Sequence, residues 1–259
     1  MFPRRALYLA VVCLGPALIC PSAFAQRKNP EGLKVLILSG GQREHHAFRE
    51  QALYLSKLLE DTGRYRVTIA EDAAILETPA FLTYDILVVP SDRRDPDSKL
   101  SPSRQQAIFS FVKSGHGYVS IHGGDNAATD WLPEWRDMLG GIFSHQGLPD
   151  GKTRKGSYTV KIVDREHPVA KGIEDFDIVD ELYYQIQMQP DVKPIATVRY
   201  QDKDWPVAWT REYGSGRVFH TPLGHQGWKD PQKDDPLRNP NLARLVVQGV
   251  DWTAEARKK

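Results

Sequence analysis

Apolar and polar positions follow two alternating patterns along most of the chain. Residues 33–39 form a nearly continuous apolar run that ends at Gly40 and Gly41, as expected of a strand buried on both faces. Residues 48–59 instead repeat apolar positions at helical spacing, and Gly63 follows where a helix would end. The same reasoning predicts further strands at 65–70, 85–89, 118–121, 158–163, 194–200, 206–210 and 217–221, and further helices over 102–112 and 240–250.

This order of elements predicts an α/β fold with a doubly wound, mostly parallel sheet and helices on both faces. The second half of the chain is richer in predicted strands than the first. The sequence has no internal repeat and no low-complexity segment. We therefore expect one domain over residues 33–255.

The first 25 residues have the pattern of a secretory leader. A basic start precedes the apolar run Ala6–Ile19, and Ala23-Phe24-Ala25 supplies the small-x-small pattern that signal peptidase cleaves. The run is shorter than a membrane span requires. We expect residues 1–25 to be a signal peptide cleaved near Ala25 and residues 26–32 to be a linker. The mature chain would then be exported, to the periplasm or the medium, and would not stay in the membrane.

Composition and charge narrow the classes of partner. Hydrophobic residues make up 41% of the chain and charged residues 26%, as in ordinary globular domains. Loss of Arg4 and Arg5 with the leader reduces 34 basic residues to 32, against 33 acidic ones, which argues against a nucleic-acid partner. Both cysteines, Cys13 and Cys20, lie in the leader, so a disulfide, a Cys-ligated metal and a Cys nucleophile are excluded from the mature chain. Lipid attachment at Cys20 is an alternative, which the bulky Ile19 disfavours.

Histidines gather at one predicted edge of the sheet. In open α/β sheets, ligands bind beyond the carboxyl ends of the strands. His46, His122 and His225 each come after a predicted strand, and Asp180 and Glu181 add a carboxylate pair before an aromatic segment. We expect these side chains to form a polar site; for Glu181, an exposed position in an acidic run is the alternative.

The turn after the fourth predicted strand is the most informative single feature. Residues 120–124 read Ser-Ile-His-Gly-Gly, which resembles a nucleophile elbow, where glycines allow a strained turn that presents one side chain. Here that side chain is the imidazole of His122, which suits acid/base catalysis or metal ligation near neutral pH. A histidine that only fixes the turn by hydrogen bonds is the structural alternative.

Aromatic residues near these loops are candidates for stacking on a sugar ring, although packing in the core would explain them as well. The candidates for substrate binding are His46, Asp125, Trp131, Trp135, His145, Tyr183 and Trp228.

The sequence offers ligands for one kind of cofactor only. His46, His122, Glu181 and His225 could form a nitrogen and oxygen site for a divalent metal such as zinc. The chain has no G-x-G-x-x-G motif and no P-loop lysine, so no nucleotide cofactor is expected. A basic stretch interleaved with aromatic residues, typical of nucleic-acid binding, is absent as well.

Taken in order, the motifs resemble those of ThuA-like proteins, a family named for trehalose utilisation. The matching pieces are Val35-Leu36-Ile37-Leu38 followed by His46, Tyr118-Val119-Ser120-Ile121-His122-Gly123, Leu139-Gly140-Gly141-Ile142-Phe143 with His145 beyond, Asp164-Arg165-Glu166-His167-Pro168, Asp180-Glu181-Leu182-Tyr183, and Gly216-Arg217-Val218-Phe219 through Leu223-Gly224-His225.

The resemblance implies the flavodoxin-like fold of the class I glutamine amidotransferase-like superfamily. It also implies a role in carbohydrate metabolism, on trehalose-like disaccharides or their keto derivatives. Relatives usually have an aromatic residue where His220 stands, so the resemblance assigns His220 no role. Glutamine amidotransferase chemistry itself is excluded, because it needs a thiolate at the elbow where this chain has His122.

The leading hypothesis is an exported enzyme that acts on a small carbohydrate by acid/base or metal-assisted chemistry. His122, Glu181 and His225 would be its catalytic residues. The alternative is a non-catalytic sugar-binding or scaffolding domain on the same fold. A protein-interaction module is a third hypothesis, and it would require an exposed apolar patch away from the strand ends.

Overall fold

The computed structural model describes residues 32–41, 44–90, 92–93, 98–125, 131–144, 151–227 and 235–258. The predicted leader and all of the predicted linker except Gly32 lie outside these residues. Within the described ranges, no helix is both long enough and apolar enough to cross a membrane.

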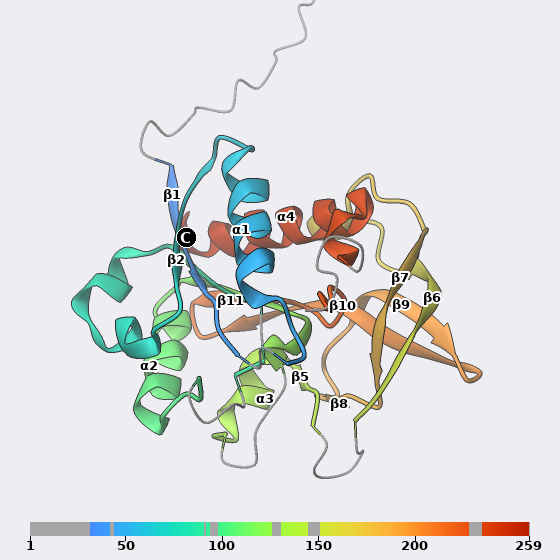
Figure 1. The fold of residues 1–259 in the computed structure, drawn as a ribbon, viewed down its shortest axis with the longest axis horizontal. Coiled ribbons are helices and arrows are strands. Elements are labelled where there is room, and N and C mark those ends of the chain that lie inside the picture. Colours follow the sequence, from blue (N-terminus) through green and yellow to red (C-terminus); the bar gives the residue numbers. More distant parts are fainter. Residues whose placement is uncertain are drawn as a thin grey trace, which may run out of the picture.

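A nine-stranded sheet runs through the molecule in the order β2-β1-β3-β4-β11-β10-β9-β6-β7 (Figure 1). The first five strands of this order are parallel to one another, and their order is that of flavodoxin-like folds. The predicted fold class is therefore confirmed. These strands are β1 (Leu33–Leu38), β2 (Tyr65–Ala70), β3 (Ile86–Val89), β4 (Gly117–Ile121) and β11 (Gly216–Thr221).

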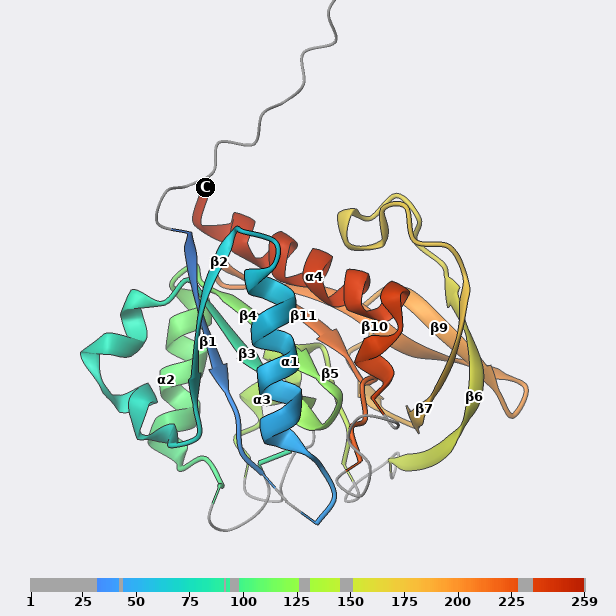
Figure 2. The ribbon, with the colours of Figure 1, turned by 45° about the horizontal axis from the view of Figure 1, so that its top comes forward.

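The other four strands extend the sheet in antiparallel fashion on the side opposite α2 (Figures 1 and 2). The hairpin of β6 and β7 forms the end of the sheet, and β5 pairs with β8 in a separate two-stranded sheet. These strands are β6 (Lys152–Ile162), β7 (Phe176–Tyr184), β9 (Pro194–Tyr200), β10 (Lys203–Tyr213), β5 (Gly141–Ile142) and β8 (Gln187–Met188).

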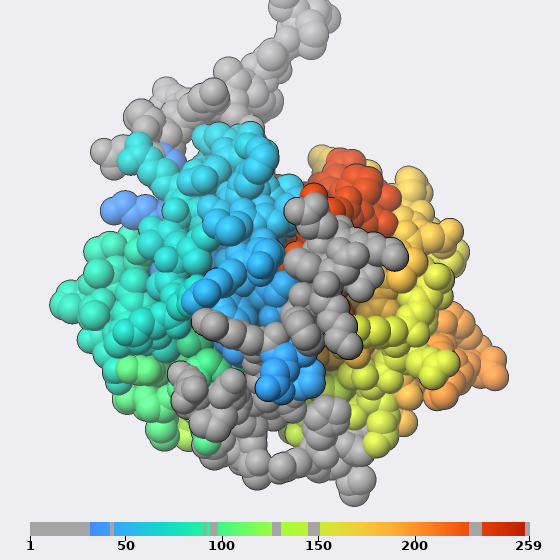
Figure 3. Space-filling model, viewed as in Figure 1, coloured from blue at the N-terminus to red at the C-terminus, as the bar shows by residue number. Residues whose placement is uncertain are grey.

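Helices cover both faces of the sheet. Apolar side chains of α1 and α4 pack on one face, and those of α2 and α3 pack on the other. The outer side of α1 forms part of the molecular surface (Figure 3). The helices are α1 (Phe48–Glu60), α2 (Pro102–Lys113), α3 (Glu134–Leu139) and α4 (Pro240–Ala254), with short 3₁₀ helices η1 (Ala73–Glu77), η2 (Pro79–Thr83), η3 (His122–Asp125), η4 (Pro168–Ala170), η5 (Pro236–Arg238) and η6 (Glu255–Lys258).

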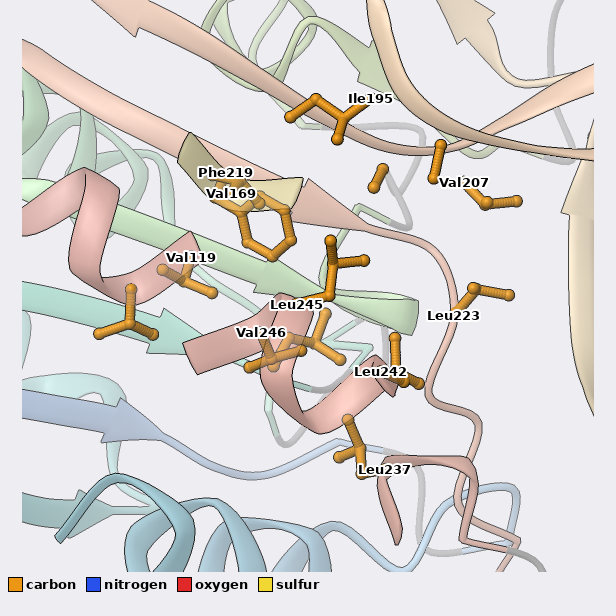
Figure 4. Close-up of a cluster of buried hydrophobic side chains, with 14 of the residues drawn as sticks. Val119, Val169, Ile195, Val207, Phe219, Leu223, Leu237, Leu242, Leu245 and Val246 are labelled. Carbon is orange, nitrogen blue, oxygen red and sulfur yellow. The ribbon is translucent and has the colours of Figure 1, made fainter. Parts of the chain in front are cut away.

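The larger core cluster lies between the sheet and the pair α1 and α4. Leu242, Leu245 and Val246 on one side of α4 pack with Val119 of β4 and Phe219 of β11 (Figure 4). Each of these side chains is fully buried. The helical spacing of apolar residues in α4 thus matches the face that it buries, and this packing fixes the strands whose ends carry the polar site.

Two parts of the fold differ from the sequence prediction. The helix α3 has six residues, too few for a periodic apolar pattern to reveal it. The strands β6 and β10 each have 11 residues, about twice the predicted length, because their exposed polar positions extend the pairing beyond the apolar runs.

Candidate functional site

Four side chains from distant parts of the sequence meet at the carboxyl ends of the parallel strands. Nδ1 of His225 lies 3.0 Å from Nε2 of His122 and 3.0 Å from Oε2 of Glu181. The last two atoms are 3.7 Å apart. The ring of His46 lies 5.2 Å from that of His122 and 5.1 Å from that of His225, measured between centroids. We call these four residues the His/Glu cluster.

The turn after β4 presents His122 to this cluster. His122 has a φ of 47°, an uncommon value for a residue with a side chain. Two residues on, a Cβ at Gly124 would collide with the carbonyl oxygen of Val89 and would lie 2.6 Å from Oγ of Ser120. The turn therefore needs glycine for its close approach to β3, as the comparison with a nucleophile elbow suggested. His122 itself is only 1% exposed.

The hydrogen bond of His122 sets the role of its second nitrogen. Nδ1 donates to the carbonyl oxygen of Pro222 over 3.0 Å, because a carbonyl can only accept. Burial, with the charges of His225 and His46, lowers the pKa of His122 well below its ordinary value. The ring is therefore neutral at pH 7, and Nε2 offers a lone pair to the cluster. Metal-ligating histidines share this arrangement of a carbonyl on one nitrogen and a free lone pair on the other.

The loop that carries His225 is held by Asp180 of β7. The carboxylate accepts backbone N–H groups of Gly224 over 2.7 Å, His225 over 3.0 Å and Glu181 over 2.7 Å. Burial raises the pKa of Asp180 to about 7, although these hydrogen bonds oppose the rise. The side chain of Gln51 on α1 adds a bond to the carbonyl of Gly224 over 2.9 Å. The position of His225 is thus fixed by both β7 and α1.

The loop after β1 brings in His46, and a backbone bond joins it to the loop of His225. The N–H of Ala47, next in sequence, donates to the carbonyl of Gln226 over 3.0 Å. His46 is 7% exposed, whereas its neighbour His45 is on the surface. Two adjacent histidines therefore have opposite environments, and only the second belongs to the cluster.

Glu181 enters from the antiparallel side of the sheet. Burial opposes ionisation, but a hydrogen bond from His225 and the charges of His122 and His225 lower the pKa of Glu181 to about 2. Lys155, directly opposite on β6, acts in the same direction. Glu181 is therefore a carboxylate at neutral pH. Its side chain is 17% exposed, the most accessible of the three groups that contact one another in the cluster.

The geometry of the cluster fits a metal ion. Ligand atoms around a tetrahedral zinc at about 2.0–2.1 Å lie about 3.3–3.4 Å from one another. Nε2 of His122 and Nδ1 of His225, which are 3.0 Å apart, lie close to that spacing. Ligand atoms of His46, His122 and His225 all lie within 4.8 Å of one another. Imidazole nitrogens are among the donors that zinc and similar divalent ions prefer.

Of the other candidate residues, Tyr183 borders the cluster and two tryptophans do not. The ring of Tyr183 lies 4.4 Å from that of His122 and stacks on Phe143. Trp135 is 1% exposed and its indole N–H donates to Gln105 over 2.7 Å, while Trp131 lies 4.7 Å from it. Both tryptophans thus belong to the core between α2, α3 and the sheet.

Asp125 ends the turn that begins at His122, and it pairs with His220 rather than with the cluster. Oδ2 of Asp125 is 3.1 Å from Nε2 of His220, and both side chains are fully buried. The ring of Trp209 covers His220 at 4.5 Å. The Asp125–His220 pair joins the η3 turn to β11. It therefore supports the loops that carry His122 and His225. His145 and Trp228, the remaining candidates, lie outside the described residues.

Sequence reasoning missed two residues that shape the site. Asp92, which follows β3, is fully buried and packs against Gly123. A Cβ added to Gly123 would lie only 2.9 Å from the Cβ of Asp92. Its position after a predicted strand was a usable signal. Lys155 had no signal, because its pairing with Glu181 depends on the register of the β6–β7 hairpin.

The sequence profile described as "ThuA: Trehalose utilisation" matches residues 34–253. The chain belongs to the ThuA family. Among solved structures, a putative ThuA-like protein from Parabacteroides merdae is similar to it with 22% identity and a TM-score of 0.71, covering 86% of this chain and 90% of the other. A putative ThuA-like protein from Bacteroides uniformis has 20% identity and a TM-score of 0.64, with 85% and 91% covered.

A more distant likeness concerns part of a larger enzyme. A β-galactosidase from Rahnella sp. R3 matches with 13% identity and a TM-score of 0.53, covering 88% of this chain but 31% of that one. Among curated proteins, no match was found. At these identities the solved structures establish the fold of this ThuA protein. Its chemistry has to be argued from the His/Glu cluster.

Proposed function

We propose that this ThuA protein is a divalent-metal enzyme that acts on a trehalose-like disaccharide or its keto derivative. The family match supports the carbohydrate context. The observation that carries the chemistry is the convergence of ligand atoms of His46, His122 and His225 within 4.8 Å of one another, with the carboxylate of Glu181 beside His122 and His225. A cluster of three buried imidazoles without a metal would be a costly way to build a core.

In this proposal the three histidines hold the ion and Glu181 moves the proton. A bound divalent ion would polarise a carbonyl or hydroxyl oxygen of the sugar. The hydrogen bond to Pro222 keeps the lone pair of His122 directed at the ion. Glu181, ionised and partly exposed, accepts a proton from the substrate at Oε2 and returns it to the product.

The adjacent histidines 45 and 46 give a matched test of metal binding. His46→Ala removes one of the three imidazoles, whereas His45→Ala changes an exposed residue beside it. We expect the zinc content of purified protein, measured by mass spectrometry, to fall from one ion per chain to near zero in His46→Ala only. Equal zinc content in the two variants, or none in the wild type, would contradict the metal assignment.

Glu181→Gln separates catalysis from metal binding. The amide keeps the size of the side chain but cannot accept the proton, so kcat on a keto-disaccharide should fall by about 10²–10⁴-fold. Zinc content should stay near that of the wild type. If wild-type protein binds the sugar but converts none with any divalent metal, the non-catalytic sugar-binding domain is the correct function instead.

We also propose export of the mature chain, on the pattern of residues 1–25. N-terminal sequencing of protein from the cell envelope or medium checks it. A new terminus at or near Gln26 is the expected result, and an intact Met1 terminus would contradict it.

A further inference from the structure

A cavity of about 420 Å³ adjoins the His/Glu cluster on the side of β7. It shares Glu181 and His225 with the cluster, so a ligand in the cavity would reach the proposed catalytic groups. The volume falls toward the lower end of the range of about 300–1,000 Å³ for small-molecule pockets, which suits one sugar ring better than a long chain. Its other lining residues come from β6, β7, η5 and the start of α4: Lys155, Ser157, Asp177, Ile178, Val179, Asp180, Asp235, Pro236 and Asn239.

The lining combines hydrogen-bonding groups with apolar surface. The carboxylate of Asp177 and the second amide hydrogen of Asn239 can bind hydroxyl groups, and Val179, which is 72% exposed, adds an apolar side chain. A pyranose ring has hydroxyls around its rim and C–H groups on its faces, and pockets for such ligands need both kinds of contact.

The charge of the lining selects against anions. Asp177, Asp180, Glu181 and Asp235 contribute carboxyl groups, against Lys155 and the imidazole of His225 among the described lining residues. A phosphate on the second ring, away from the proposed metal ion, would meet the carboxyl groups of Asp177 and Asp235 at an energetic cost. The chemistry therefore favours an uncharged ligand.

The wall of the cavity is fixed before any ligand binds. Asn239 caps α4 by accepting the N–H of Asn241 over 3.0 Å, and its amide donates to the carbonyl of Asp177 over 2.9 Å. Asp235 caps η5 by accepting the N–H of Leu237 over 3.1 Å. These bonds fix the start of α4 and η5 against β7. The loss of conformational entropy when a ligand binds should therefore be small.

We infer that this cavity binds the non-reacting ring of an unphosphorylated disaccharide while the other ring lies at the His/Glu cluster. The inference rests on the proposed function and adds to it which side of the cluster holds the second ring. The cavity would then make the protein selective for disaccharides over monosaccharides.

Two exposed valines provide a matched pair of variants. Val179→Trp fills the cavity, whereas Val163→Trp places the same side chain at an exposed position outside the lining. Ser157→Tyr fills the cavity from β6 and serves as a second variant if Val179→Trp folds poorly. Isothermal titration calorimetry of the zinc-loaded wild type and variants gives their affinities for trehalose, glucose and trehalose 6-phosphate. Circular dichroism checks that each variant is folded.

Wild-type protein should bind trehalose at least about tenfold more tightly than glucose, because the second ring adds more than one hydrogen bond. It should also bind trehalose more tightly than trehalose 6-phosphate. Val179→Trp and Ser157→Tyr should lower trehalose affinity to that of glucose, and Val163→Trp should leave it unchanged.

Two different failures can be told apart. If both cavity-filling variants bind trehalose as the wild type does, the cavity is not the second-ring site, although the proposed function stands. If phosphorylation improves binding, the charge argument and the inference are wrong. If wild-type protein binds neither trehalose nor glucose, the proposed substrate class is wrong and the inference falls with it.

Discussion

At the scale of single residues, Asp180 shows how one buried carboxyl group organises the site. It lies next to Glu181 in the sequence, yet it points to the other side of β7 and holds the loop of His225 by two backbone hydrogen bonds, from Gly224 and His225. Its pKa of about 7 lies above the ordinary value of about 3.9. Between those pH values the folded chain keeps a proton that the unfolded chain has released.

The contribution of Asp180 to the free energy of unfolding should therefore fall as the pH rises from about 4 to about 7. Three pKa units correspond to a contribution of about 4 kcal/mol, fully present below pH 4 and lost as the pH passes 7. Asp180→Asn should remove this contribution, so the difference in unfolding free energy between wild type and variant, measured in urea, should change by about 4 kcal/mol between pH 4 and pH 7. Asp177→Asn, at an exposed position on the same strand, should keep the wild-type slope. Parallel profiles for wild type and Asp180→Asn would show that Asp180 stays ionised throughout.

The members of the cluster could be predicted from the sequence, but the orientation and role of each side chain could not. His46, His122 and His225 were predictable because each follows a strand of the parallel half, where strand ends meet at one edge. Asp180 and Glu181 are adjacent, and nothing in the sequence tells which faces the histidines. Trp131 and Trp135 lie after the turn of His122, yet burial against α2 decides their environment.

At the scale of elements, the turn between β4 and α3 carries the strictest local requirement. Gly124 has the carbonyl of Val89 and the hydroxyl of Ser120 where a side chain would begin. Backbone atoms of β3 cannot move aside without disturbing the centre of the sheet.

Gly124→Ala should consequently lower the free energy of unfolding by about 2–4 kcal/mol. Gly63 offers the comparison, since it has a φ of 69° but no surrounding atom within 4 Å of the place that an alanine methyl group would take. Gly63→Ala should cost only about 1 kcal/mol, for the backbone conformation alone. Chemical denaturation of both variants checks the order. Equal costs would mean that the turn after β4 relaxes around a methyl group.

The parallel strands and three of the helices follow from apolar periodicity, because each buries a continuous face. The antiparallel extension does not follow in the same way. Its strands were visible in part, but the register that places Lys155 opposite Glu181 depends on the hairpin as a whole. The cavity beside β7 therefore had no counterpart in the sequence prediction.

At the scale of the whole molecule, the metal proposal predicts a link between ion binding and global stability. The cluster joins the loop after β1, the end of β4, the loop after β11 and the strand β7. A ligand that binds only the folded chain stabilises it by mass action, by about 2.7 kcal/mol at a free concentration about 100 times its Kd.

Removal of metal by a chelator should hence lower the melting temperature of wild-type protein, and added zinc should restore it. His46→Ala should melt at the same temperature with and without chelator, whereas His45→Ala should respond as the wild type does. A differential scanning calorimetry series measures all three. If the chelator leaves the melting temperature of the wild type unchanged, metal binding and global stability are not linked.

The position of Glu181 has a consequence for how the site is lost. The three histidines belong to loops anchored in the middle of the sheet, but the glutamate belongs to β7, the last strand in the order and paired with β6 alone among the described strands. Fraying of that margin would withdraw the only carboxylate among the four groups while the parallel half stayed folded. Catalysis should then fail before the protein unfolds, and the protection of β7 amides from hydrogen exchange should report the lifetime of the working enzyme.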